Sequence, residues 1–221
     1  MSPQREPLPL PMPLPLQWVG GWLCLDFNNT IDWKGLEAAE DERLSTYERL
    51  VQWGSEAGVL SDGTGAQLLS EAAQRPTAAQ RVLKRAWDLR AMIHALFFAI
   101  IRGDHPDPTA LGSLNDLLAG VPAEVQPTES GEAQFGWGWS GKPNDLACML
   151  WPIAWSAGQL LTSPDLVQVK TCANDTCGWL FLDTSRKHNR RWCEMRTCGN
   201  RAKARGFYER RRRGSGRGAA G

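Results

Sequence analysis

The fold of the C-terminal part is decided by two cysteine pairs, Cys172-Ala-Asn-Asp-Thr-Cys177 and Cys193-Glu-Met-Arg-Thr-Cys198, which fifteen residues separate. Tetrahedral zinc requires four ligands, and two cysteine pairs supply them. The usual spacing within a pair is two residues, so buried free thiols and disulfides stay open as alternatives. We expect one structural zinc ion per chain, and its predicted ligands are Cys172, Cys177, Cys193 and Cys198.

The residues between the pairs predict a hairpin that brings the pairs together. Residues 179–182 form an apolar, strand-like run, residues 185–189 are polar and basic, and Trp192 directly precedes the third cysteine. A site closed by four thiolates leaves no coordination position for water, which favours a structural zinc over a catalytic one. His188 lies in the turn but is a less favoured ligand, because four thiolates suffice.

Charge is distributed unevenly along the chain. From Cys172 onward there are thirteen Lys and Arg against four Asp and Glu, whereas the preceding residues carry twelve against twenty. A basic segment attached to an acidic body indicates a polyanion partner, and we expect duplex DNA. The predicted nucleic-acid-binding residues are Arg186, Lys187, Arg190, Arg191, Arg201, Lys203, Arg205, Arg210, Arg211, Arg212 and Arg213.

A basic helix is expected after Cys198, because small and aromatic residues alternate there with arginine and lysine. Arg201 and Arg205 are one turn apart and could follow a DNA groove on the same face as Tyr208. Asn200 suits either a helix N-cap or a base contact. Trp179 and Trp192 either pack inside the module or stack on bases.

The pattern of the whole chain predicts an α+β protein, with a mainly helical N-terminal domain that has a few strands. A small four-cysteine zinc finger follows, built as a hairpin and then a basic helix. The predicted divisions are a disordered Pro-rich arm at 1–16, a ligand-sensing or dimerisation domain at 17–165, the finger with its helix at 166–213, and a disordered tail at 214–221.

Capping boxes that begin at Ser45, Thr64 and Thr77 predict three helices, and the third carries an apolar stripe up to Ile100. Other elements are predicted less directly. They are a buried strand at Trp22–Phe27, a helix after Pro108, a loop at 121–133, a strand at 135–139, a helix at Asp145–Thr162 kinked by Pro152, and a strand at Leu166–Val169.

The run Cys198-Gly199-Asn200-Arg201, with Arg190-Arg191-Trp192 before it, resembles the CGNR zinc finger of bacterial proteins. Residues 23–30, Leu-Cys-Leu-Asp-Phe-Asn-Asn-Thr, resemble the opening of the ABATE domain that precedes this finger. The resemblance extends over nearly the whole chain after residue 16 and is most specific at the finger. It implies a stress-induced transcription regulator.

The combined interpretation is a DNA-binding transcription regulator of the bacterial cytoplasm, with a small-molecule effector and a homodimer as candidate partners. The alternatives are a zinc-stabilised protein–protein interaction module and an RNA-binding accessory factor. We expect no enzyme, because neither His94 nor His105 has a visible catalytic partner. We also expect no membrane span or signal peptide. The eleven tryptophans favour either a core with a dimer face or an aromatic-lined ligand pocket.

Overall fold

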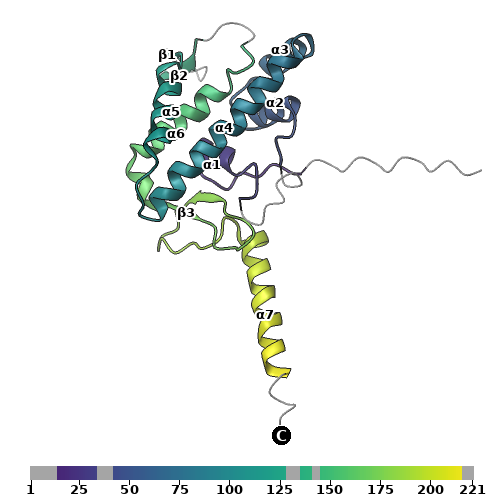
Figure 1. The fold of residues 1–221 in the computed structure, drawn as a ribbon, viewed down its shortest axis with the longest axis vertical. Coiled ribbons are helices and arrows are strands. Elements are labelled where there is room, and N and C mark those ends of the chain that lie inside the picture. Colours follow the sequence, from purple (N-terminus) through teal and green to yellow (C-terminus); the bar gives the residue numbers. More distant parts are fainter. Residues whose placement is uncertain (1–13, 34–41, 128–134, 141–144, 216–221) are drawn as a thin grey trace, which may run out of the picture.

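The computed structural model describes residues 14–33, 42–127, 135–140 and 145–215, with the side chains of 62 and 209–215 left out. Most of the predicted Pro-rich arm and of the predicted C-terminal tail therefore lies outside the described residues. A helical body occupies one end of the molecule, and a single helix, α7, extends from the other end (Figure 1). The mainly helical class with a few antiparallel strands confirms the predicted fold.

Five helices build most of the body: α2 (Tyr47–Glu56), α3 (Asp62–Gln74), α4 (Pro76–Ile101), α5 (Pro108–Ala119) and α6 (Leu150–Leu161). The apolar stripe of α4 is buried as predicted, with Ile93 and Phe97 fully covered. The helix starts differ from the predicted boxes by one to three residues. Thr46 caps α2 by accepting a hydrogen bond from Arg49 N, and Ser61 caps α3 by accepting one from Thr64 N.

The predicted strand at Trp22–Phe27 is wrong, because residues Leu23–Asn28 form the short helix α1. Short apolar runs do not reveal by periodicity whether they are strand or buried helix. Cys24, Leu25 and Phe27 are fully buried, and α1 packs against α6, α4 and the strand β4 (Leu180–Leu182) of the C-terminal module. The centre of the core is thus helical.

A two-stranded antiparallel sheet joins α5 to α6. Its strands are β1 (Ala123–Pro127) and β2 (Phe135–Trp139). The strand at 135–139 is confirmed, whereas β1 falls within the stretch predicted as loop. Trp137 and Trp139 of β2 pack on Trp155 of α6, with ring centroids 5.0 and 6.2 Å apart.

The kink expected from Pro152 is absent, because α6 begins only at Leu150. Pro152 thus sits in the first turn, where backbone N–H groups have no intrahelical acceptor and proline is tolerated. Residues 146–149 form a turn instead of the predicted first helical turn.

The C-terminal module starts with a 3-10 helix at Pro164–Gln168, where a strand was expected, and continues into β3 (Val169–Thr171). β3 pairs antiparallel with β4 (Leu180–Leu182), so the hairpin encloses the first cysteine pair. The expectation that the hairpin lies between the two pairs is wrong. A π-turn at Met195–Gly199 then leads into α7 (Asn200–Ser215).

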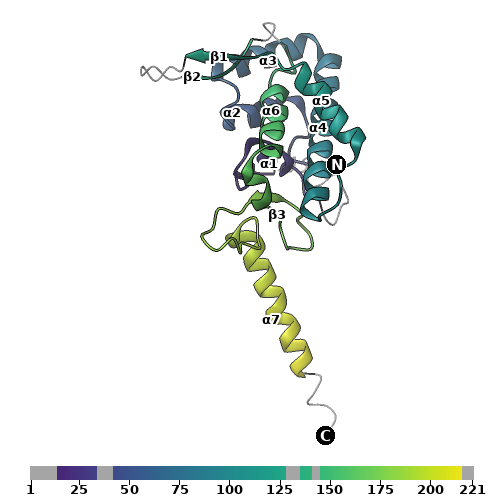
Figure 2. The ribbon, with the colours of Figure 1, turned by 90° about the vertical axis from the view of Figure 1, so that its left-hand side faces the viewer.

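Seen from a second side, α7 again points away from the body, and β3 lies beneath α1, α4 and α6 (Figure 2). No described helix is long and apolar enough to cross a membrane.

Candidate metal centre and nucleic-acid interface

The four cysteine thiols converge as predicted. The Sγ atoms of Cys172, Cys177, Cys193 and Cys198 all lie within 4.8 Å of one another, and all four residues are buried. The Sγ atom of Cys193 is 3.7 Å from that of Cys177 and 3.6 Å from that of Cys198. Zinc–sulfur bonds of about 2.3 Å at tetrahedral angles place the sulfurs about 3.8 Å apart. The donor set therefore fits a tetrahedral metal ion, and no described cysteine is in a disulfide.

The four thiols also affect the ionisation of one another. Hydrogen bonds from Cys177 and then Cys193 lower the pKa of Cys172 to about 2. The same interactions with Cys172 raise the pKa of Cys177 and of Cys193. The protein atoms alone therefore favour one thiolate at the expense of its neighbours. A bound divalent cation would allow all four to ionise.

Each residue after Cys198 in the CGNR run has a distinct structural setting. A Cβ atom on Gly199 would lie 2.4 Å from Met195 Sδ and 3.1 Å from Trp192 Cδ1, so only glycine fits without displacing them. The side chain of Asn200 donates to the carbonyl of Arg196 at 3.0 Å. It closes the π-turn and does not accept a bond as an N-cap would. Arg201 is exposed.

The finger is bonded to the body through the segment that follows α1. Asn29 donates from Nδ2 to the carbonyl of Leu180 at 2.8 Å and accepts from Leu180 N at 2.9 Å. Trp33 N donates to the carbonyl of Cys177, and Trp179 Nε1 donates to the carbonyl of Ile31, both at 2.8 Å. Asn29 thus supplies the hydrogen bonds of a neighbouring strand, a role that the sequence reading as a simple turn did not reveal.

The two tryptophans of the finger differ. Trp179 is 3% exposed and packed, with the guanidinium of Arg43 5.0 Å from its ring centroid. Trp192 is half-buried beside Met195, at the surface next to α7. Of the two, only Trp192 is placed where a nucleic acid could touch it.

The loop at 183–190 is organised by a buried carboxylate. Asp183 accepts from Lys170 Nζ at 2.6 Å, from Ser185 Oγ at 2.5 Å and from Arg190 N at 2.9 Å. Burial acts to raise the pKa of Asp183, but these hydrogen bonds outweigh it and lower the pKa. His188 directs Nδ1 to the carbonyl of Asp183 at 3.0 Å and is not part of the metal cluster.

Arg190 and Arg191, adjacent in sequence, have different surroundings. The Arg190 guanidinium donates to the carbonyls of Trp192, Leu182, Val19 and Cys193 and covers the ring of Phe181. Arg191 is exposed and lies over the Trp192 ring, 5.2 Å from its centroid.

The other predicted nucleic-acid-binding residues are spread over the loop and α7. Arg186 and Lys187 are exposed on the loop, and Arg201, Lys203 and Arg205 are exposed on α7. Arg205 is bonded to Asp175 and Asn174. Arg210 to Arg213 continue α7, but their side chains lie outside the described residues.

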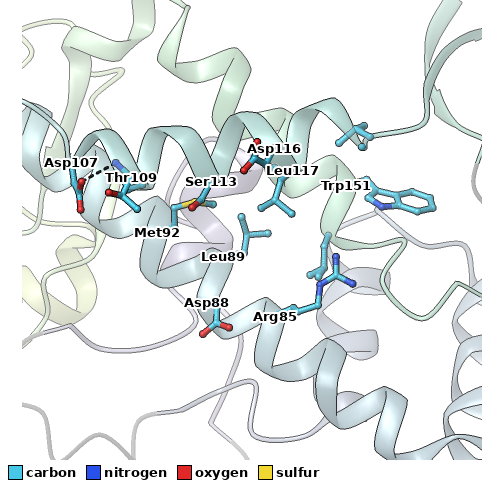
Figure 3. A pocket seen from close by; sticks show the side chains of 15 residues that line it. Arg85, Asp88, Leu89, Met92, Asp107, Thr109, Ser113, Asp116, Leu117 and Trp151 are labelled. Carbon is cyan, nitrogen blue, oxygen red and sulfur yellow. Dashed lines mark hydrogen bonds between the residues drawn. The ribbon is translucent and has the colours of Figure 1, made fainter.

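A separate groove lies in the body, between α4, α5 and α6 (Figure 3). It has a volume of about 590 Å³, and Leu89, Met92 and Leu117 converge at its floor. The polar groups around it include Arg85, Asp116 and Ser113. Trp151 lines it, but the other tryptophans do not gather there. Trp53, for example, is in the core, and Trp33 stacks on His94.

Comparison with known families agrees with this architecture. A family model named ABATE, with the description "Putative stress-induced transcription regulator", matches residues 21–164. The model of the CGNR zinc finger matches residues 168–211, which include the four clustered cysteines. Neither is an enzyme family, and no curated protein matches the chain. The resemblance noted at Cys198–Arg201 and at residues 23–30 is thereby confirmed, and the chain belongs to the ABATE family, with a CGNR zinc finger at its C-terminal side.

Proposed function

We propose that this protein is a transcription regulator that binds duplex DNA through its zinc finger and α7. The observation that carries the proposal is the exposure of α7 to solvent. None of residues 200–208 is buried, although the segment includes Phe207 and Tyr208, which are 50% and 65% exposed. A basic helix whose described side chains are exposed or half-buried, and which starts at a rigid centre, is suited to a groove of DNA.

The metal at this centre is proposed to be one structural Zn²⁺ held by the four cysteines. It would fix the π-turn from which α7 starts, and so the direction of the helix. Exposed Arg186, Lys187 and Arg191 on the adjacent loop would add phosphate contacts. Arg190 is held by backbone carbonyls, so we assign it mainly to the integrity of the loop.

The salt dependence of binding tests the proposal. With roughly five to eight phosphates neutralised, log K should fall with log salt at a slope of about −5 to −7. A double variant, Arg201→Ala with Lys203→Ala, should flatten the slope by roughly 2 units. The matched control is Arg81→Ala with Lys84→Ala, which removes two exposed charges from α4 and should leave the slope unchanged.

The alternatives make different predictions in the same assay. An RNA-binding factor would prefer RNA when duplex DNA and RNA compete for the full-length protein. A protein–protein interaction module would show no salt-dependent binding to either. Loss of duplex binding by the α4 double variant, with binding retained by the α7 double variant, would place the interface elsewhere.

A second proposed activity is the binding of a small-molecule effector in the groove of Figure 3. The groove volume falls within the roughly 300–1,000 Å³ of known ligand pockets, and its floor is apolar with polar groups at the rim. Ser113→Trp should fill the groove and abolish binding of fragment-sized apolar molecules detected by NMR. Asn115→Trp, on the same helix but outside the groove lining, is the matched control.

A further inference from the structure

Of the described basic side chains on α7, Arg205 is held in place by the first cysteine turn. Its Nη1 donates to Asp175 Oδ2 at 2.5 Å, and its Nη2 lies 3.5 Å from Asn174 Oδ1. No hydrogen bond or ion pair joins the side chain of Arg201 or of Lys203 to any described residue. The free protein therefore orients one arginine of α7 and leaves its neighbours to solvent.

The acceptors that hold Arg205 are themselves tied to the metal centre. Asn174 is 2% exposed, and its Nδ2 donates to Cys198 Sγ at 3.4 Å. Its Oδ1 also lies 3.4 Å from the backbone nitrogen of Thr176, which closes the turn. The position of the Arg205 guanidinium is thus set from the same turn that supplies two of the four thiols.

The held guanidinium still has donors to offer. Arginine carries five N–H donors, and Asp175 and Asn174 engage two of them. The Arg205 side chain is 43% exposed, so the remaining donors are accessible. Guanine presents two acceptors, O6 and N7, in the major groove, which a fixed guanidinium can bind together. A fixed side chain also loses less conformational entropy when it binds.

Asp175 is an unusual neighbour for a DNA-binding helix. Its side chain is 79% exposed, so its charge would face the phosphates of a bound duplex and weaken binding to every sequence. The charge of Asp175 lowers the affinity for non-specific DNA, and the same carboxylate orients Arg205 for a specific base contact. Both effects increase the difference in affinity between specific and non-specific DNA sites.

We propose that Asp175 is a positioning residue that fixes Arg205 for recognition of a guanine base pair. The inference rests on the proposed DNA-binding function. The first cysteine turn, some twenty-five residues before α7, then has a role in sequence specificity.

The test uses the zinc-loaded, full-length protein and duplexes selected from a random pool. Asp175→Ala should lower discrimination at one G·C base pair by about tenfold or more, while it tightens binding to unrelated duplexes. In an Arg205→Ala background the same substitution should change that discrimination less than about twofold, because the two residues act as a unit. Glu71→Ala is the matched control. Glu71 lies on α3, and its replacement removes the carboxylate partner of another arginine, Arg75, so neither the discrimination nor the affinity for unrelated duplexes should change.

Zinc content and thermal stability of Asp175→Ala should equal those of the wild type, since Asp175 is exposed. Tighter binding to all duplexes with discrimination retained would overturn the inference, because Asp175 would then merely compete with DNA for Arg205. Unchanged discrimination would overturn it as well and leave the proposed function intact. A wild-type protein that binds no duplex would instead refute the proposed function, and this inference with it.

Discussion

Two adjacent arginines show how far identical side chains can differ in role. Arg190 directs its guanidinium to backbone carbonyls of three separate segments, at Val19, at Leu182 and around Cys193. Arg191 is exposed and stacked on Trp192. The charge density predicts phosphate contacts for both and cannot distinguish them, because the carbonyls meet Arg190 only once the loop has folded against β4 and Val19, which is 171 positions away.

The first prediction follows from this difference. Arg190→Ala should reduce the free energy of unfolding by about 2–4 kcal/mol, because several carbonyls lose a charged hydrogen-bond donor. Arg191→Ala should change stability by less than about 0.5 kcal/mol and weaken duplex binding. Urea unfolding followed by circular dichroism measures the first quantity, and salt-dependent titration measures the second. Equal stabilities of the two variants would contradict the assignment of Arg190.

His94 gives the second prediction, on pH dependence. It stacks on Trp33 with ring centroids 3.7 Å apart, and its Nδ1 lies 3.2 Å from Asn28 Oδ1. Burial lowers the pKa of His94 to about 4. The unfolded chain, with an ordinary pKa near 6.5, therefore binds more protons between pH 6.5 and 4. The stability that His94 contributes should be complete above pH 6.5 and be lost as the pH falls toward 4.

Asp26 opposes this trend, because burial raises its pKa to about 6 and the folded state then holds more protons between about pH 4 and 6. The His94 contribution is isolated by subtracting the stability of His94→Gln from that of the wild type at each pH. The difference should decline from pH 6.5 to 4. His105→Gln, in an exposed loop, is the matched control for the loss of an imidazole. A difference that does not vary with pH would exclude a neutral, buried His94.

At the scale of elements, the sequence predicts those helices and sites that a pattern of nearby residues determines. The apolar stripe predicts α4, a helix of twenty-six residues, and the paired spacing of the four cysteines predicts that they meet. The strand expected at Trp22–Phe27 is instead the helix α1, because a short apolar run interrupted only by Asp26 fits either state. β1 was missed because Glu124 and Gln126 read as loop until Trp137 and Gly138 pair with that stretch.

The hairpin of the finger was misplaced for a related reason. Leu180–Leu182 is a strand as expected, but its partner precedes the first cysteine pair, and Asn29 of the body occupies its other side. Nothing in the spacing of the cysteines indicates this contact, which joins residues about 150 positions apart. The ligand set could be predicted, and the attachment of the finger to the body could not.

The turn into α7 gives the third prediction. Gly199→Ala places a methyl group against Met195 and Trp192, so it should destabilise the protein by about 1–3 kcal/mol and weaken DNA binding by misdirecting α7. Gly112→Ala is the matched control, because a Cβ there meets nothing within 4 Å on the exposed side of α5. It should raise stability by roughly 0.5–1 kcal/mol. A neutral Gly199→Ala variant would show that Met195 moves aside freely.

At the scale of the whole molecule, finger and body share one core. Val169, Leu180 and Leu182 of the finger hairpin belong to the same buried cluster as the helices of the body. Cys172, Cys177, Cys193 and Cys198 form a second cluster with Phe181, directly behind β4. One side of the strand β4 thus packs on the body and the other side packs on the metal centre. Unfolding of either part should therefore destabilise the other.

The last prediction concerns metal removal. Structural zinc contributes on the order of 10 kcal/mol to the folding of small modules, and here β4 would lose its support when the thiols separate. A chelator under reducing conditions, or Cys193→Ser, should therefore lower the melting temperature of the body as well as of the finger. Helical circular dichroism and tryptophan fluorescence should report a single transition, because α1, α4 and α6 pack on the shared core. Cys148→Ser, a half-buried thiol outside the metal cluster, should keep the metal and shift the melting temperature little. Two separate transitions, with the helical signal of the body melting at its original temperature, would show that the finger is an independent unit despite the hydrogen bonds of Asn29.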